Sequence, residues 1–502
     1  MLFNSFSFLV FFPIVVGLYF IIPKKYRQFW LLIASYYFYM NWNAVYAILI
    51  LGITVIGYVG GILLDRVETG VHKDDAIKVA RKRKLCMVIC AVLSLGILFT
   101  FKYLNFAVDN INRLLQLVGS SAQIGNSISL ILPVGISFYT FQALGYIIDV
   151  YRKDVPAEKS FMRYALFVSF FPQLVAGPIE RSKNLLKQLE KPTSFDYESA
   201  RRGLMLMLWG YFEKMWVADR AAILVDNVYE NYGNYSAGMI ILATALFSIQ
   251  IYCDFGGYSH IAIGAAKVLG IDLMDNFRQP YLATSIKEFW NRWHISLSTW
   301  FRDYLYFPLG GSRCSKPKAY RNLMITFLVS GLWHGANWTY VVWGGINGLY
   351  QVIGRMTKPF KERVRSFLHI REDAFFLRIL QMLITFVLAS FAWLFFRAEG
   401  IGQAIAMIRH AMANGVLWQQ FTDGTIFMMG LSRLGIYQLI FALIVLLIVD
   451  IFHECKVSLR DWVSKRNIVI RWEIYLVVLV AFVVLVIQNY GRPAAEFIYF
   501  QF

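Results

Sequence analysis

The residue of this chain with the clearest chemical potential is a histidine in an uncharged stretch. His334 lies within Asn322–Gly354, a run of 33 residues that contains no Asp, Glu, Lys or Arg. A polar side chain at membrane depth is costly and is a functional candidate by default. Histidine is also the side chain best suited to proton transfer near neutral pH. A packing histidine with one hydrogen bond is the alternative, and position alone does not separate the two.

A second histidine, His294, stands forty positions earlier in the segment EFWNRWHISLSTW. Its neighbours Glu288 and Arg292 and the surrounding tryptophans are typical of a membrane interface. His294 is therefore either a residue of the site or part of an interfacial aromatic belt, and residue types alone favour the belt. His260, in CDFGGYSHIAIG, is ambiguous.

Several other chemistries lack the residues that they require. The sequence has no HExxH, HxxxH or CxxC pattern and an odd number of cysteines, five, so we expect neither a metal site nor a disulfide framework. The GxSxG elbow of serine hydrolases, a Walker A lysine motif and GxGxxG are also missing. Serine-hydrolase, ATP-driven and nicotinamide mechanisms therefore have no support.

The elements that position these histidines belong in a lipid bilayer. The chain has 502 residues, of which 58% are hydrophobic and 16% charged, whereas soluble domains are roughly 45–50% apolar and about 25% charged. The mean hydropathy is +0.52. Uncharged runs such as Gln28–Leu64 and Leu114–Ile148 occur from end to end. About 20 apolar residues cross a bilayer as a helix, so the longest runs must fold back or pack inside a bundle.

We predict an all-α, polytopic membrane protein in which residues 1–502 form one domain, with about 11–13 transmembrane or re-entrant helices around a central cavity. Asn41–Trp42–Asn43 supplies polar groups for a turn that divides the run 28–64. Two segments, 183–202 and 282–307, mix basic, aromatic and apolar residues and are typical of the interface. The predicted spans lie near 6–22, 28–41, 43–64, 85–104, 129–149, 164–179, 203–222, 236–253, 322–350, 379–397, 425–449 and 473–490.

The charges indicate membrane topology rather than a nucleic-acid partner. The net charge is +18, and the basic residues gather in short loops between the predicted spans. Such clusters mark cytoplasmic loops that face anionic lipid. Loops at 24–27, 66–84 and 456–471 are then cytoplasmic, and both the N-terminus and the C-terminus lie outside.

Long motifs in this chain resemble those of the membrane-bound O-acyltransferases, and within them the bacterial alginate O-acetyltransferase-like branch. The likeness extends over nearly the whole chain. It includes LPVGISFYTFQALGYIIDVYR at 132–152 and FFPQLVAGPIER at 170–181, and the most specific matches are EFWNRWHISLSTWFRDYLYFPLGGSR at 288–313 and SGLWHGANWTYVVWG at 330–344. Where the branch reads DFSGYSDMAIG, this chain reads DFGGYSHIAIG, so His260 stands in place of an aspartate and Gly256 in place of a serine.

The resemblance implies an enzyme that moves an acyl group from a thioester to a hydroxyl. It assigns the catalytic position to His334 as general base, with His294 as the second histidine of the pair. It implies a donor substrate, acetyl-CoA or another acyl thioester such as an acyl carrier, and no tightly bound cofactor. Asn337 is a candidate to hold an oxyanion or the histidine tautomer. The residues expected to line the substrate tunnel are Asn337, Trp333, Asn291, Trp293 and Gly335, and those expected to hold the donor phosphates are Arg313, Lys316, Lys318 and Arg321.

The resemblance also implies a place and a product. We expect O-acetylation of a cell-envelope or extracellular polysaccharide across a bacterial cell membrane, together with an extracytoplasmic SGNH-type acyltransferase partner. Residues 497–502, FIYFQF, are either a belt that anchors the last helix or an acyl-carrying tail in which Tyr499 takes the acyl group. D-alanyl transfer toward teichoic acid is the alternative within the family. A membrane transporter or channel and an inactive scaffold are alternatives of other classes.

Overall fold

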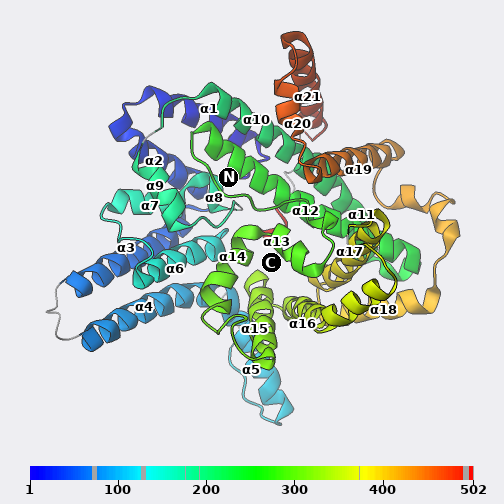
Figure 1. Cartoon of the computed structure of the whole chain (residues 1–502), viewed down its shortest axis with the longest axis horizontal. Helices are drawn as coiled ribbons and strands as arrows, with labels where there is room; N and C mark the ends of the chain where they lie inside the picture. The colour runs from blue at the N-terminus through cyan, green and yellow to red at the C-terminus, as the bar shows by residue number, and fades with distance from the viewer. Residues whose placement is uncertain are drawn as a thin grey trace. The chain divides into compact units, whose positions relative to one another are not determined.

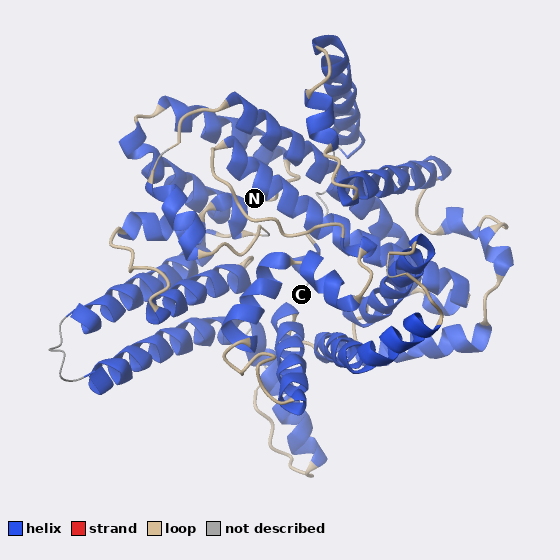
Figure 2. Cartoon of the chain, viewed as in Figure 1, coloured by secondary structure: helices blue, strands red, loops and turns tan. Residues whose placement is uncertain are grey.

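The computed structural model describes residues 1–69, 76–125, 132–175, 177–191, 193–371, 373–489 and 497–500. All regular secondary structure within these ranges is helical (Figures 1 and 2). Internal contacts divide the chain into two compact units, Met1–Leu204 with Ala262–Met274, and Met205–Ile261 with Asp275–Phe502. This division into two units does not test the prediction that residues 1–502 form one domain.

Five helical segments in the described part of the chain are long and apolar enough to cross a membrane. They correspond to five of the predicted spans, and they confirm the multi-pass helical class. The central cavity stays a prediction. The five segments are Ala44–Glu68, Ala76–Leu117, Ala237–Val268, Phe375–Arg397 and Arg433–Glu454.

The first unit begins with helices that the uncharged runs predicted. The turn between α2 and α3 falls where the sequence places it, because the Asn43 side chain accepts a hydrogen bond of 3.0 Å from the backbone N–H of Val45. In this unit α3 packs against α4 and α6. The helices that lie in the first unit are α1 (Phe6–Ile21), α2 (Arg27–Met40), α3 (Ala47–Thr69), α4 (Ala76–Leu98), α5 (Leu104–Leu117), α6 (Ile136–Arg152), α7 (Phe161–Ser169), α8 (Phe171–Leu174) and α9 (Ser182–Glu190).

Two spans predicted for this unit differ from the helices in the structure. The helix expected near 85–104 begins at Ala76 and continues through a π-helical turn to Leu117. The span expected near 164–179 is wrong, because α7 ends at Ser169 and the four-residue α8 follows a kink at Phe170. Nine helical residues cover only about 14 Å, against a hydrocarbon core of about 30 Å. The beginning of the predicted 129–149 span lies outside the described residues.

The second unit holds both histidines of interest. Helices α10 and α11 are joined by a seven-residue π-helical turn, Phe212–Ala218. The predicted interfacial segment 282–307 contains short helices rather than one crossing helix. The helices that lie wholly or partly in this unit are α10 (Tyr197–Tyr211), α11 (Asp219–Glu230), α12 (Ala237–Val268), α13 (Ile286–Arg292), α14 (Ile295–Phe301), α15 (Lys316–His334), α16 (Trp338–Phe367), α17 (Phe375–Arg397), α18 (Ile401–Asn414), α19 (Arg433–Glu454), α20 (Leu459–Ser464) and α21 (Ile468–Asn489).

The run 322–350 forms a helical hairpin and not the single span that we predicted. Helix α15 ends at His334 and α16 begins at Trp338, so the turn lies in the middle of the uncharged stretch. The two helices approach closely at glycines. A Cβ on Gly331 would lie 2.2 Å from the Tyr340 carbonyl oxygen, and one on Gly344 would lie 2.3 Å from that of Phe327. Because α15 ends at His334, this packing fixes His334 at the tip of the hairpin.

Candidate active site

His334 is the last residue of α15 and is almost completely buried, with 2% of its surface exposed. Aromatic rings surround its imidazole. The ring centroids of Trp333 and Trp343 lie 5.0 Å away, and those of Phe396 and Tyr499 lie 5.4 and 5.5 Å away. The nearest rings include one phenol, which carries a hydroxyl that a base can deprotonate.

His294 lies at the corner between α13 and α14. Its backbone is left-handed, with φ 42° and ψ 54°, and only 1% of its surface is exposed. Its Nδ1 lies 3.1 Å from the Oδ1 atom of Asn276. The same oxygen also accepts a hydrogen bond of 3.3 Å from the backbone N–H of Ser296, which can only donate. The oxygen of Asn276 therefore faces the imidazole, so Nδ1 carries the proton and Nε2 of the neutral ring is the acceptor.

The surroundings of His294 keep this imidazole neutral. The residue lies outside the five long apolar helical segments, and its complete burial lowers its pKa to about 3. A neutral histidine with one fixed tautomer can accept a proton or a hydrogen bond at neutral pH. Asn276 is itself held, because its Nδ2 donates to the hydroxyl of Ser259 over 3.1 Å.

The structure brings His294, His334 and Tyr499 together in the second unit. The two imidazole centroids are 6.5 Å apart. The ring of Phe255 on α12 lies 4.6 Å from His294 and 4.6 Å from Tyr499. The hydroxyl oxygen of Tyr499 is buried, and burial raises the pKa of this phenol well above its ordinary value. Tyr499 therefore needs an adjacent base to ionise at neutral pH, and His334 is in ring contact with it.

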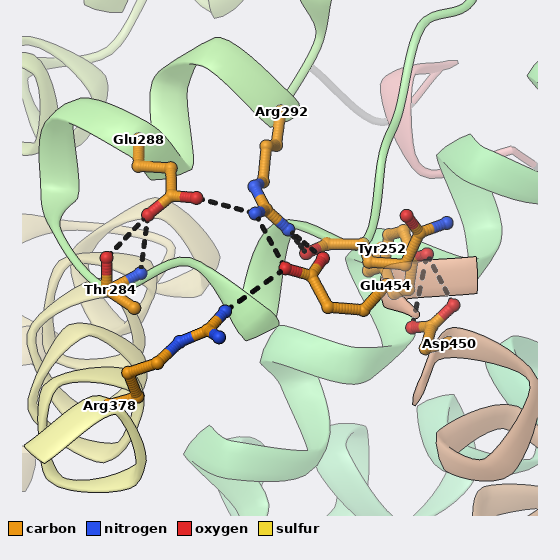
Figure 3. Close-up of polar contacts among 8 residues, drawn as sticks. Tyr252, Thr284, Glu288, Arg292, Arg378, Asp450 and Glu454 are labelled. Carbon is orange, nitrogen blue, oxygen red and sulfur yellow. Dashed lines mark hydrogen bonds and ion pairs between the residues drawn. The ribbon is translucent and has the colours of Figure 1, made fainter. Parts of the chain in front are cut away.

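An ion-pair network around Arg292, the last residue of α13, holds the end of this helix beside the α13–α14 corner (Figure 3). Arg292, two residues before His294, donates two hydrogen bonds of 2.6 and 3.1 Å to Glu454 at the end of α19. It also donates one of 2.5 Å to Glu288. Burial raises the pKa of Glu288, but hydrogen bonds from Thr284 and Arg292 outweigh it and leave the pKa below its ordinary value. Glu288 is therefore ionised at neutral pH and pairs with the arginine.

The other residues predicted to line a substrate tunnel occupy different settings. Asn337 caps α16, because its Oδ1 accepts from the Thr339 N–H over 3.0 Å, while its Nδ2 donates to the carbonyl of Glu399 over 3.0 Å. Gly335 permits close packing, since a Cβ there would lie 2.1 Å from the Tyr340 ring. These contacts give Asn337 and Gly335 a structural part at the hairpin turn.

The predicted tryptophans and Asn291 differ in burial. Trp333 is buried beside both histidines, with ring centroids 6.0 Å from His294 and 5.0 Å from His334. Trp293 is fully buried and packs on Trp393 and Phe289, at 4.9 and 5.4 Å. Asn291 is exposed. A tunnel-lining part for these residues stays a prediction.

The four basic residues predicted to hold the donor phosphates are all exposed and lie at the N-terminal end of α15. The partial positive charge of a helix N-terminus adds to theirs. His334 is at the other end of the same helix, about 27 Å away along its axis. The four residues are Arg313, Lys316, Lys318 and Arg321.

The structure adds two residues that the sequence did not indicate, Asn276 and Glu213. Asn276, which sets the His294 tautomer, has no motif of its own. His260, which stands where the resembled branch has an aspartate, contacts Glu213 with its Nδ1 2.5 Å from the Oε2 atom. A carboxylate is therefore present beside position 260, but residue 213 supplies it. Among the described residues, no three metal-ligand candidates form a group.

Comparison with known proteins decides the family. The model of the membrane-bound O-acyltransferase family matches residues 153–397. The probable alginate O-acetylase AlgI of Pseudomonas aeruginosa is 39% identical over 420 residues, which cover 84% of this chain and 76% of the relative. The chain belongs to the membrane-bound O-acyltransferase family. The resemblance drawn from the sequence motifs is confirmed, and the protein is a multi-pass membrane O-acyltransferase.

The names of other relatives refer to different acceptors. The peptidoglycan O-acetyltransferase of Helicobacter pylori is 32% identical over 416 residues, which are 78% of this chain and 74% of the relative. The teichoic acid D-alanyltransferase of Streptococcus thermophilus is 30% identical over 256 residues, which are 48% of this chain and 60% of the relative. The family thus fixes O-acyl transfer and leaves the acyl group and the acceptor to be inferred.

Proposed function

We propose that this membrane-bound O-acyltransferase moves an acetyl group from acetyl-CoA to Tyr499 and, through a partner protein, to an envelope polysaccharide. The observation that carries this proposal is the ring contact between Tyr499 and His334, 5.5 Å between centroids, with the phenol oxygen buried. A phenol whose pKa is raised by burial reacts only if a base takes its proton.

In the first step, a ring nitrogen of His334 takes the hydroxyl proton of Tyr499 while the phenol oxygen attacks the thioester carbonyl. The C–S bond then breaks, and the thiolate of the donor leaves with the proton that the imidazole returns. The product is an aryl acetate on Tyr499. An aryl ester keeps much of the transfer potential of a thioester, because phenolate is a far better leaving group than an alkoxide.

In the second step, a serine hydroxyl of an extracytoplasmic SGNH-type partner attacks the aryl ester and releases the phenol. The partner then passes the acetyl group to the polysaccharide. The relatives named as alginate O-acetylase and peptidoglycan O-acetyltransferase support an envelope polysaccharide as the final acceptor. The protein would lie in the bacterial cell membrane with its C-terminus on the extracytoplasmic side, as the distribution of basic loops favours.

D-alanyl transfer toward teichoic acid is the second candidate, and the relative from Streptococcus thermophilus supports it. The O-acetylases match a larger share of this chain, 78–84% against 48%, and therefore favour acetyl. A transporter or channel predicts two related halves with discontinuous helices, and the sequence has no such halves.

Turnover of radiolabelled acetyl-CoA by the purified protein in lipid vesicles tests the proposed activity. We expect release of free CoA together with protein-bound label, and more label when the partner and the polymer are added. D-alanyl-loaded carrier protein in place of acetyl-CoA tests the second candidate. A protein that neither releases CoA nor retains label, but moves solute across the vesicle, would contradict the proposal.

His294 is expected to assist placement rather than to take the proton. We predict that His294→Ala lowers acyl transfer to a smaller extent than His334→Ala. Asn276→Ala should give a defect in the same direction, because it removes the acceptor that fixes the tautomer of His294. Removal of a group that orients a metal-binding histidine typically costs ~10–100-fold in activity, and we expect a loss of similar size here. Rates of acyl-CoA consumption by the three variants measure this, and equal loss in His294→Ala and His334→Ala would refute the division of roles.

The basic cluster at the start of α15 is expected to bind the phosphates of CoA. Changing Arg313, Lys316 and Lys318 to Glu should raise the KM for acetyl-CoA with little change in kcat. Each lost charge-assisted hydrogen bond corresponds to roughly ten-fold in affinity. The control reverses two charges, at Lys465 and Arg466, in another predicted cytoplasmic loop. An unchanged KM would leave the cluster with a topological role only.

A further inference from the structure

The described end of the chain, Phe497–Phe500, is bound to α12 through its backbone. The N–H of Ile498 donates a hydrogen bond of 2.7 Å to the Oδ2 atom of Asp254, which is only 4% exposed. The other carboxylate oxygen of Asp254 forms an ion pair with Lys214. Lys214 also pairs with Asp219, at 2.9 Å. A backbone hydrogen bond of this kind binds the chain at a fixed position whatever the side chain of residue 498.

Aromatic contacts on both sides of Ile498 complete the attachment. Phe497 is fully buried, and its ring lies 4.5 Å from Tyr258 and 5.6 Å from Phe255. Two residues further, the ring of Tyr499 stacks on Phe497 at 5.4 Å. The Ile498 backbone bond and the Phe497 contacts therefore set where the Tyr499 ring meets His334.

The position of Lys214 follows from close packing of helices in the same unit. A Cβ on Gly257 would lie 2.6 Å from the carbonyl oxygen of Gly210 and 3.0 Å from the backbone nitrogen of Lys214. Lys214 lies in the π-helical turn Phe212–Ala218, and such turns occur frequently at functional sites. The two glycines therefore allow the turn to approach α12 closely enough for the Lys214–Asp254 pair to form.

We propose that Asp254, Lys214, Phe255 and Tyr258 form a reversible binding site for a peptide of the pattern aromatic–x–Tyr, occupied by the chain's own C-terminal segment. A buried carboxylate without a counter-charge is strongly unfavourable. Because Lys214 pairs with Asp254 independently of the tail, the charge of Asp254 stays compensated when the tail leaves. The inference rests on the proposed function, in which Tyr499 must dock beside His334 and later reach a partner. Asp254 and Lys214 are positioning residues.

The first test measures hydrogen exchange at the Ile498 amide in the full-length protein. Asp254→Ala should accelerate this exchange about 10- to 100-fold, the factor expected for loss of a hydrogen bond to a charged acceptor. Lys214 still has Asp219 in this variant, so it is not left without a counter-charge. The control Asp219→Asn removes the other partner of Lys214 and should leave exchange at Ile498 near the wild-type rate. Unchanged exchange in Asp254→Ala, with α12 amides still protected, would overturn the proposed site.

The second test changes the tail instead of the site. Ile498→Pro removes the donating N–H, whereas Ile498→Ala removes most of the side chain and keeps the N–H. We expect acetylation of Tyr499 to fall about 10- to 100-fold in Ile498→Pro and to change much less in Ile498→Ala. Equal acetylation in the two variants would overturn the role of the backbone hydrogen bond.

Together with Tyr499→Phe, these tests distinguish failure of the proposed binding site from failure of the proposed function. If Asp254→Ala frees the Ile498 amide but Tyr499→Phe still supports polymer acylation, the binding site stands and the relay is wrong. If Tyr499→Phe stops transfer but Asp254→Ala leaves the Ile498 amide protected, the relay stands and the binding site is wrong.

Discussion

Replacement of His334 by alanine is expected to lower acyl transfer by ~10²–10⁴-fold, the range typical for loss of a general base. The reason is that the buried phenol of Tyr499 has a raised pKa and is in ring contact with this imidazole. The measurement is acyl-CoA consumption by purified protein in lipid vesicles.

Two controls separate chemistry from folding in this experiment. His334→Gln keeps much of the side-chain volume among Trp333 and Trp343 but supplies no comparable base, so it should be as inactive as His334→Ala. His369→Ala changes an exposed histidine and should leave turnover unchanged. Near-normal turnover in a well-folded His334→Ala protein would refute the assignment of His334 as the base.

The second large effect is expected from Tyr499→Phe, which removes one oxygen and keeps the ring. The contacts of residue 499 with Phe255 and Phe497 are ring contacts and should persist. Loss of the attacking oxygen should nevertheless lower polymer acylation. The expected loss is no smaller than the ~10²–10⁴-fold loss expected for His334→Ala. The acetyl content of polymer from cells that carry the variant measures this.

Tyr437→Phe, at an exposed position on α19, is the matched control and should acylate the polymer normally. If Tyr499→Phe cells produce fully acylated polymer, residues 497–500 have the role of a membrane anchor and not of an acyl carrier.

The sequence predicts the long apolar helices well, but it predicts poorly where an apolar run breaks into two helices. Lack of charge identifies Arg433–Glu454 and Phe375–Arg397, because only such runs satisfy both length and hydropathy. The same criterion joins α15 and α16 into one span, since the turn Gly335–Asn337 carries no charge. It also misses the end of α7 at Ser169, which is followed by Pro172 in a run that is otherwise apolar. Hydropathy measures composition, whereas these breaks depend on backbone conformation and capping.

Some residues of the candidate site can be predicted from the sequence and others cannot. His334 and His294 were predicted because one is isolated among uncharged residues and both lie in specific motifs. Asn276 and Asp254 were not predicted, because their importance depends on contacts far apart in sequence. Asn276 reaches His294 across 18 positions, and Asp254 reaches Ile498 across 244. A single sequence carries no periodic signal for such pairs, so only the folded chain identifies them.

The most direct test of the acyl-carrying role of Tyr499 is mass analysis of the C-terminal peptide after brief incubation of purified protein with acetyl-CoA, in the absence of any partner. We predict one acetyl group on Tyr499 in the wild-type peptide and none in the peptides from Tyr499→Phe and His334→Ala. A wild-type protein that consumes acetyl-CoA and supports polymer acylation while its C-terminal peptide never carries an acetyl group would contradict the account.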